Sequence, residues 1–536
     1  MSLPRVSPVM RRLREELPFV LGCLVACGLL ARPGMVFFGQ ACGSDWPTYL
    51  ENAARLWHPE RTELVYQDWR KPLHALLVGL AGEPLGYVRG AQWLTLVATV
   101  ATVLGAGLLG RSLGSRTVGV LAALVVALLP SLEQSGRWVN LYPLLAGLGA
   151  LALGLAAACL RWPRWELGGL AGLAGGLAWA CDDRGVGPLV LSLLAVLAAV
   201  VTVRSKGWWA AAILAAALVG AGAGWGLDQG LQARLGLTTR SLQQQVAVQS
   251  EVSMGPNVPV AVRQACAPER LESLGGLRFG RDCARELLPH NWAELVSFEA
   301  LPPPWWLLLL LPALLPARWG RRSSAGVALL LGGSAAALVA GMAVVAYPER
   351  YALLQLVAMA ALLPVGLERL VERLVPMGSP RLGGRVALVV AVLVVMGWVW
   401  PRFWPVSRTP AAFCREAGIP IAGLEPERQA VLAWMRRSLQ PKDLLLDCSN
   451  SSFDELALPR RLPLREARPG GDTCSRWVRS PPVVEGTVWL VTTVDQVGLA
   501  AMLPESEEEL SGLGWTLEPL PEVSEEAGGV LRLWHR

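Results

Sequence analysis

The stretch LYPLLAGLGALALGLAAACL at Leu141–Leu160 contains no charged side chain. An α-helix rises about 1.5 Å per residue, so about 20 apolar residues cross the roughly 30 Å hydrocarbon core of a bilayer. This stretch has that length, and it therefore predicts a transmembrane helix. The arrangement of similar stretches on either side of it determines the fold class.

Similar apolar stretches occur throughout the part of the chain before Pro401 and predict a polytopic α-helical membrane protein with about 11 transmembrane helices. The composition agrees, because 53% of the 536 residues are hydrophobic and only 17% are charged, which excludes an ordinary soluble or disordered chain. The net charge of +6 is spread between the apolar stretches, which excludes a nucleic-acid-binding surface. The predicted spans are Leu17–Val36, Tyr87–Leu109, Thr117–Leu129, Leu141–Leu160, Gly168–Cys181, Val186–Val203, Trp208–Leu227, Trp305–Ala317, Ala325–Ala346, Tyr351–Leu367 and Val386–Trp400.

Lysine and arginine in the short connections predict the orientation, because cytoplasmic loops carry an excess of these residues. Placing the amino terminus inside puts roughly 17 of them on the cytoplasmic side and roughly 7 outside. The sequence therefore predicts a multi-pass protein of a bacterial inner membrane, with a cytoplasmic amino terminus. The first stretch also fits a signal peptide, but its length and the lack of a small-x-small cleavage site favour an uncleaved helix.

This topology predicts two domains. Residues 1–400 form a transmembrane domain with a first outer loop at about 37–86 and a large outer loop at about 228–304. Residues 401–536 form a small extracytoplasmic α/β domain, because Glu427–Leu439 has helical periodicity. The segments Leu444–Asp447, Val488–Val494 and Val530–Trp534 have the composition of strands in the same domain.

The cysteines are consistent with this topology. Six of the 10 fall on the predicted outer side, where an oxidising compartment permits disulfides. Proximity in the sequence favours the pairs Cys266–Cys283 and Cys448–Cys474. A metal site is not indicated, because the chain has no CxxC and its four histidines are scattered.

Polar and ionisable residues gather where the predicted helices emerge on the outer side, whereas the spans themselves are almost free of them. A channel or pump places such groups at mid-bilayer depth, so the pattern favours a site at the membrane surface, open to a lipid from the side. The residues of this set are Asp45, Glu51, Asp68, Arg70, Lys71, Glu133, Arg137, Asn140, Asp182, Asp183, Arg184, Glu349 and Arg350.

Several weak motifs, taken in order, resemble the GT-C class of integral-membrane glycosyltransferases, in its protein O-mannosyltransferase and aminoarabinose-transferase branch. GSDWPTYLENAARLW at Gly43–Trp57 is similar to the first outer loop of that family, with its acidic residue, Tyr and amphipathic helix. WRKPLHALLVGLAG at Trp69–Gly82 resembles its basic-Pro-Leu segment. Two segments resemble later elements of that family. Gly168–Leu191 is similar to its Gly-rich helix that ends in a basic residue, and YPERYALLQLVAMAALLP at Tyr347–Pro364 is similar to its late Arg-Tyr-Leu-Leu element.

The resemblance implies transfer of a hexosyl or pentosyl group from a polyprenyl-phosphate donor to an acceptor on the outer face of the plasma membrane. Asp45 then corresponds to the catalytic acidic residue, because an acceptor hydroxyl or amine needs a base. Lys71 and Arg70, together with Arg137 and Arg350, become candidate ligands of the donor phosphate, since cations stabilise the leaving charge. The candidate sugar or acceptor contacts are Tyr49, Asp68, Arg184 and Glu349.

Simpler interpretations exist for the same residues. An Asp before a helix with Pro in its first turn is a common N-cap, and Arg70 and Lys71 could reach lipid headgroups. The single acidic residue in the first loop argues against a divalent metal held by the protein alone. A lipid-linked saccharide transporter or polymerase and a non-enzymatic membrane assembly protein are the alternative functions; no partner other than the lipid-linked sugar, an unidentified acceptor and membrane lipids is indicated.

Overall fold

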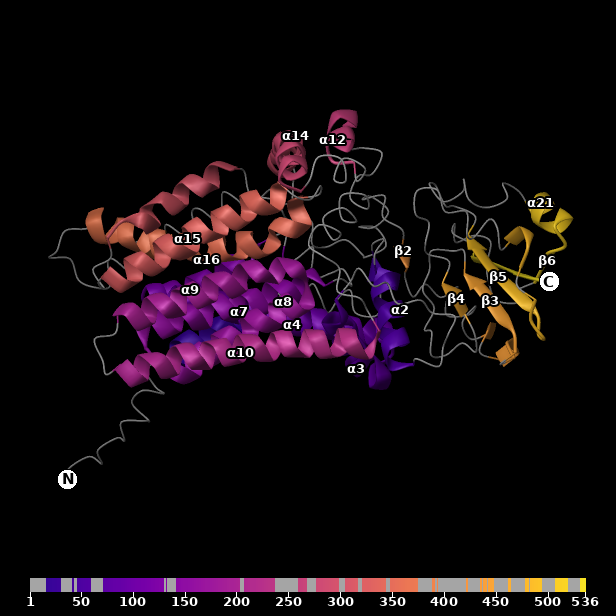
Figure 1. The fold of residues 1–536 in the computed structure, drawn as a ribbon, viewed down its shortest axis with the longest axis horizontal. Coiled ribbons are helices and arrows are strands. Elements are labelled where there is room, and N and C mark those ends of the chain that lie inside the picture. The colour runs from indigo at the N-terminus through magenta and orange to yellow at the C-terminus, as the bar shows by residue number, and fades with distance from the viewer. Residues whose placement is uncertain are drawn as a thin grey trace, which may run out of the picture.

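The structure is a computed structural model, and Figure 1 shows its fold. The description below covers residues 16–29, 41–42, 46–58, 71–129, 132, 141–202, 207–236, 259–267, 276–297, 304–316, 321–343, 348–374, 388–390, 393, 421–422, 434–435, 437–440, 442–447, 461–463, 478–481, 483–493, 507–518 and 531–536.

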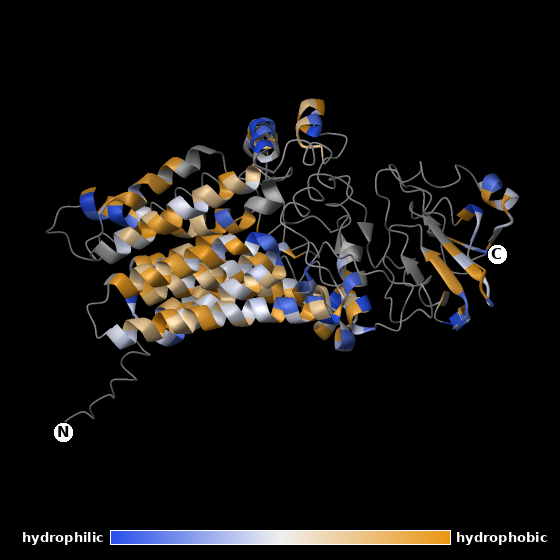
Figure 2. Cartoon of the chain, viewed as in Figure 1, coloured by the Kyte–Doolittle hydropathy of each residue, from blue (hydrophilic) through white to orange (hydrophobic). Residues whose placement is uncertain are grey.

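Helices long and apolar enough to cross a membrane dominate the described residues before 400. They are Tyr87–Leu113, Tyr142–Arg161, Asp183–Val201, Gly207–Arg234, Ser323–Met342 and Leu353–Leu374, and two shorter apolar helices lie at Glu16–Leu29 and Arg116–Ala127. Figure 2 shows the apolar colouring along this helical part. The prediction of a polytopic α-helical membrane protein is confirmed.

The central helices pack side by side in Figure 1. α4 (Tyr87–Leu113) packs against α5 (Arg116–Ala127) and α7 (Tyr142–Arg161), and α7 packs against α8 (Trp165–Cys181). The short 3₁₀ turn η1 (Asp183–Gly185) links α8 to α9 (Val186–Thr202), which returns along α7. α10 (Gly207–Arg234) covers the other side of α8.

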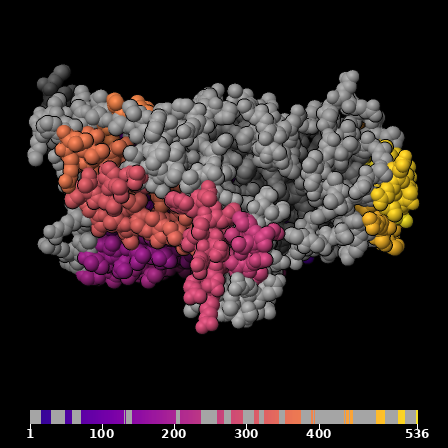
Figure 3. Space-filling view, turned by 90° about the horizontal axis from the view of Figure 1, so that it is seen from above, coloured from indigo at the N-terminus to yellow at the C-terminus, as the bar shows by residue number. Residues whose placement is uncertain are grey.

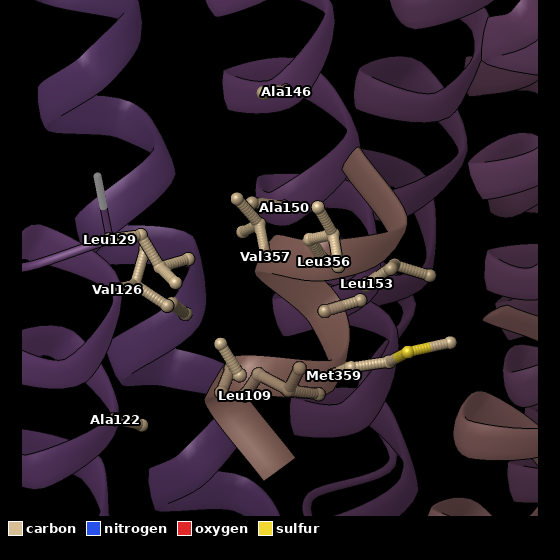
Figure 4. Close-up of a cluster of buried hydrophobic side chains, with 14 of the residues drawn as sticks. Leu109, Ala122, Val126, Leu129, Ala146, Ala150, Leu153, Leu356, Val357 and Met359 are labelled. Atoms are coloured by element: carbon tan, nitrogen blue, oxygen red, sulfur yellow. The ribbon is translucent and has the colours of Figure 1, made fainter. Parts of the chain in front are cut away.

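The largest apolar core lies where a late helix meets the early ones. α16 (Pro348–Leu374) packs against α4, α5 and α7, and also against η2 (Pro304–Leu314) and α15 (Arg321–Met342). In Figure 4, Leu356 and Val357 of α16 lie near Ala150 of α7. Residues more than 200 positions apart in the chain therefore share one core, in which these side chains are all buried.

Two helices of the first predicted outer loop extend from this bundle. α2 (Trp46–Trp57) packs against α3 (Pro72–Leu85), and α3 packs against α4. Gly86 joins α3 to α4 with φ of 83°, a backbone conformation that favours glycine. α3 also contacts α8 and α10, so its first residues lie beside the bundle.

The second predicted outer loop contains α12 (Val260–Ala265) and α14 (Gly276–Ser297). A disulfide joins Cys266 to Cys283, which is one of the two pairs that sequence proximity favours. Figure 3 shows this segment at the surface of the molecule, and α14 contacts α15 and α16. The other favoured pair, Cys448–Cys474, lies outside the described residues.

The region after residue 401 contains a five-stranded sheet. Its strand order is β4 (Arg461–Pro463), β3 (Leu444–Asp447), β5 (Val488–Thr493), β7 (Leu531–His535) and β6 (Thr516–Leu517). β3 is parallel to both β4 and β5, whereas β7 is antiparallel to its neighbours. Three of these strands coincide with the segments predicted from sequence, and α21 (Glu507–Gly512) contributes Leu510 to one apolar face.

A short pairing connects the first predicted outer loop with the chain after residue 401. β1 (Ala41–Cys42) is antiparallel to β2 (Ile421–Ala422). The stretch that leads into α2 therefore contacts a segment nearly 400 residues further along the chain.

Several observed helices differ in their limits from the predicted spans, and one predicted span differs in helix type. α10 does not stop at Leu227 but continues through Asp228 to Arg234, because packing against α8 extends it past the first charge. The span expected at Trp305–Ala317 is the 3₁₀ helix η2 instead; Pro312 within it removes a backbone donor, which disfavours a regular α-helix.

Candidate functional site

Lys71 is the centre of a polar cluster at one end of the bundle. It is the N-cap of α3 in an extended conformation, and the following Pro72 suits the first helical position. Its Nζ donates to the carbonyl oxygen of Trp179 at 2.8 Å, and it lies 4.8 Å above the indole ring of the same residue. Lys71 therefore occupies the carboxyl end of α8, where the helix dipole and its unpaired carbonyls favour a cation.

Two carboxylates complete the surroundings of the Lys71 amine. Nζ lies 2.8 Å from Oδ1 of Asp183 in η1 and 3.3 Å from Oδ2 of Asp228 in α10. The Asp183 side chain is 33% exposed, whereas that of Asp228 is 2% exposed. Among the described residues, Oδ1 of Asp228 has no hydrogen-bond partner. We call Lys71, Trp179, Asp183 and Asp228 the Lys71 cluster.

Arg184 lies beside this cluster and is bound within its own turn. Its Nε lies 2.5 Å from Oδ1 of Asp182 and its Nη2 2.7 Å from Oδ2, while its guanidinium covers the ring of Tyr142 at 4.9 Å. Burial raises the pKa of Asp182, but the charge and hydrogen bonds of Arg184 outweigh it and bring that pKa below its usual value. Asp182 is therefore a permanent partner of Arg184 at neutral pH.

The first turns of α2 and α3 lie together. Tyr49 is buried, and its ring meets that of His74 edge to face at a centroid distance of 5.0 Å. His74 lies one turn after Lys71, so this contact brings the beginning of α2 close to the Lys71 cluster.

Two further candidates from the sequence, Glu349 and Arg350, lie in the first turn of α16. Asp45, Asp68, Arg70 and Arg137 lie outside the described residues. The structure places three of the predicted site residues in one region. Lys71 contacts Asp183 of η1, the turn that also contains Arg184. Tyr49 of α2 contacts His74, which lies one turn after Lys71 in α3.

Sequence reasoning missed Asp228 as a site residue. It is the first charged residue after the apolar stretch that begins at Trp208, so the composition predicts that a loop begins there. An acid buried at a helix end needs a counter-charge, and Lys71 is that counter-charge. Within the described ranges no group of three or more His, Cys, Asp and Glu side chains is arranged to hold a metal, and the amine of Lys71 lies between the two carboxylates of the cluster.

A cluster of arginines lies at the other end of α8, next to the start of that helix. Arg161, the last residue of α7, donates to the carbonyls of Arg111 at 2.7 Å and Gly114 at 2.6 Å. Glu16 binds both Arg111 at 3.1 Å and Arg116 at 2.8 Å. We call Arg111, Arg116, Arg161 and Glu16 the arginine cluster; its contacts cap helix ends, so its role in the described structure is structural.

The fold is similar to that of solved membrane enzymes. ArnT from Cupriavidus metallidurans, solved with bound undecaprenyl phosphate, aligns with a TM-score of 0.52 and 13% identity over 98% of each chain. The Archaeoglobus fulgidus oligosaccharyltransferase, tethered with an acceptor peptide, aligns with a TM-score of 0.43 and 13% identity over 84% of this chain. The chain spans 64% of the length of that oligosaccharyltransferase. The sequence matches no protein-family profile and no curated protein.

The likeness to ArnT defines the class of fold. The chain is a multi-spanning membrane protein with a GT-C-like fold, as the resemblance of its sequence motifs implies.

Proposed function

We propose that the chain is a glycosyltransferase that moves a sugar from a polyprenyl-phosphate donor to an acceptor. The observation that carries the proposal is the Lys71 amine, which a backbone carbonyl and two carboxylates fix at the end of an apolar bundle. A cation in that position can bind the phosphate of a lipid whose tail stays in the bilayer, once one of its present partners moves away. The likeness to ArnT, solved with undecaprenyl phosphate, supports the same class of lipid.

Asp45 is the proposed base. It directly precedes Trp46, the first residue of α2. The contact between Tyr49 and His74 brings the first turn of α2 to the first turn of α3, where Lys71 is the N-cap. This contact supports a shared site for the acid of the first loop and the phosphate-binding lysine.

The proposed reaction is a single displacement with inversion. A hydroxyl or amine of the acceptor attacks the anomeric carbon while Asp45 takes its proton, and the bond between that carbon and the phosphate oxygen breaks. The electron pair leaves with the polyprenyl phosphate, whose growing negative charge Lys71 stabilises. A phosphate is a good leaving group, so the reaction needs no general acid. Arg70, Arg137 and Arg350 are further proposed contacts of the phosphate.

We also propose that the Lys71 cluster faces the outside of a bacterial inner membrane and that residues 401–536 form an extracytoplasmic domain. Two observations support this orientation. The arginine cluster lies at the opposite end of α8, as expected for a cytoplasmic surface. The Cys266–Cys283 disulfide suits an oxidising compartment on the side of the large loop.

The decisive experiment uses the full chain in lipid nanodiscs with a panel of labelled polyprenyl-phosphate sugars and follows release of the lipid phosphate. For the sugar that reacts, Asp45→Asn lowers kcat about 10²- to 10⁴-fold, the range for loss of a general base. Lys71→Ala raises KM and lowers kcat, because phosphate binding and leaving-group stabilisation are both lost. Asp282→Asn, which removes the carboxylate that pairs with Arg281 in α14, is the control and retains activity.

Other results favour the alternatives. The same protein is also reconstituted in sealed lipid vesicles. Movement of the sugar-linked lipid from one leaflet to the other without release of lipid phosphate identifies a transporter. If Asp45→Asn and Lys71→Ala both retain full cellular function, the chain is a non-enzymatic assembly protein and the proposal is contradicted.

A further inference from the structure

We propose that Asp183 and the donor phosphate are alternative partners of Lys71, so that Asp183 leaves the amine when the lipid phosphate binds. This inference rests on the proposed function, because it takes Lys71 as the ligand of that phosphate. It adds a role for Asp183, as a built-in competitor, and one for Asp228, as the anchor of Lys71.

The first step is a count of hydrogen-bond donors. A lysine ammonium carries three N–H groups and no acceptor. Three acceptors lie around Nζ of Lys71: the carbonyl of Trp179 at 2.8 Å, Oδ1 of Asp183 at 2.8 Å and Oδ2 of Asp228 at 3.3 Å. Three acceptors therefore already surround an amine with three N–H groups, and a phosphate oxygen that binds the amine competes with them.

The second step identifies the partner that is replaced. The Trp179 carbonyl belongs to the last turn of α8, and its indole ring also contacts the cation. Asp228 is buried, and its second oxygen has no hydrogen-bond partner among the described residues, so removing the amine would leave a buried charge unpaired. The side chain of Asp183 is one-third exposed, so it can rotate into water at a lower cost. Asp183 is the exchangeable partner.

The third step is the charge of the cluster. The formal charges of the cluster sum to −1, because Lys71 contributes one ammonium and Asp183 and Asp228 contribute one carboxylate each. An anionic cluster repels a phosphate. Rotation of Asp183 towards water leaves the neutral pair of Lys71 and Asp228 beside the incoming headgroup. The neighbouring ion pair of Asp182 and Arg184 has no net formal charge.

The exchange predicts that a mutation at the site tightens the binding of the lipid phosphate, whereas most mutations at a binding site weaken it. Asp183→Asn removes the competitor and therefore tightens binding of a polyprenyl phosphate to the full chain in nanodiscs, by about fivefold for a partly exposed ion pair. Farnesyl phosphate serves as the probe, with Kd measured by titration. Asp183→Glu keeps a competing carboxylate, so its Kd for farnesyl phosphate stays within about twofold of the wild-type value.

A matched control removes the same charge elsewhere. The side chain of Asp282 is 34% exposed, close to the 33% of Asp183, and it pairs with the exposed Arg281 at 3.2 Å. Asp282→Asn leaves the Kd unchanged. Asp183→Ser, which also removes the charge, repeats the test if the Asn variant does not fold.

The outcomes separate this inference from the proposed function. If Lys71→Ala does not weaken binding of farnesyl phosphate to the chain, Lys71 does not hold the phosphate, and both proposals are overturned. If Lys71→Ala weakens binding but Asp183→Asn binds no more tightly than the wild type, only the exchange is overturned. Tighter binding by Asp183→Asn, without a change in Asp282→Asn, supports it.

Discussion

Arg184 contacts two side chains of its own chain, Asp182 and Tyr142, and this arrangement has a measurable consequence. Two of its nitrogens bind Asp182, and its guanidinium lies over Tyr142, so the turn between α8 and α9 is fastened to the start of α7. We predict that Asp182→Asn lowers the stability of the protein at pH 7 by about 1–3 kcal/mol, the usual range for hydrogen bonds to charged groups. Thermal unfolding in detergent measures the difference.

The pH dependence of this effect follows from the pKa of Asp182. Arg184 holds that pKa below its ordinary value, so the folded protein binds the Asp182 proton less readily than the unfolded chain. The stabilisation is therefore fully present above about pH 4, the unfolded-state value, and is lost as the pH falls through the lower pKa of the folded state. The difference between wild type and Asp182→Asn stays constant from pH 8 to about pH 5 and shrinks below about pH 4. A difference that grows on acidification contradicts the assignment.

The role of Lys71 as a phosphate ligand stays a prediction, which came from its position in the first outer loop, directly before a proline. The structure places its amine at the end of α8. Asp228 was not predictable, because its burial depends on contact with a lysine 157 positions earlier in the chain. A charge that ends an apolar stretch has the same local pattern whether it enters water or pairs with a distant residue.

At the scale of elements, the contact between α8 and α10 is made by small residues. A Cβ added to Gly172 would lie 2.0 Å from the Ala217 carbonyl oxygen, and one on Gly224 would lie 2.3 Å from the carbonyl carbon of Gly176. The two backbones therefore touch, as in other membrane helix pairs with small residues four apart. This approach positions Asp228, one turn after Gly224, beside the end of α8.

We predict that Gly224→Leu separates α8 from α10 and withdraws Asp228 from Lys71. The expected loss of stability is about 1–3 kcal/mol, as for other overpacked cores, and the Kd for farnesyl phosphate changes with it. Gly226→Leu is the control on the same helix, because no atom lies within 4 Å of a Cβ at Gly226. Thermal unfolding and titration compare the two variants. Equal unfolding temperatures and equal Kd values for the two variants would show that the contact between α8 and α10 does not position the site.

The sequence predicted most elements but not all of their limits. The apolar stretch at Leu141–Leu160 coincides with α7 because its length alone determines a span. The ends of α10 and α16 extend beyond their predicted spans because neighbouring helices stabilise the polar residues there. The strands at Leu444–Asp447 and Val488–Thr493 were expected, but their parallel pairing depends on register between distant segments. Local pattern predicts such strands without predicting their neighbours.

At the scale of the whole molecule, polar contacts occur at both ends of the bundle and differ in kind. The Lys71 cluster contains a partly exposed carboxylate and, within the described structure, an oxygen without a hydrogen-bond partner, which suits a site that exchanges partners. Near the arginine cluster, Arg369 is buried and bound to neutral oxygens. It donates to the carbonyls of Ala313 and Leu315 and to Oγ of Ser323.

Arg369 thereby links three elements, and a fourth is joined through Ser323, whose hydroxyl donates to the Leu113 carbonyl at 2.7 Å. We predict that Arg369→Gln destabilises the protein by about 2–5 kcal/mol, because several buried hydrogen bonds are lost together. The Kd for farnesyl phosphate, measured below the unfolding temperature, stays within about twofold of the wild type, since the change is confined to the other end of the bundle. Arg373→Gln is the control, because Arg373 lies one turn later on α16 and is exposed. If Arg369→Gln weakens phosphate binding as strongly as Lys71→Ala without lowering the unfolding temperature, the two ends are coupled, and the division into a structural end and a binding end is wrong.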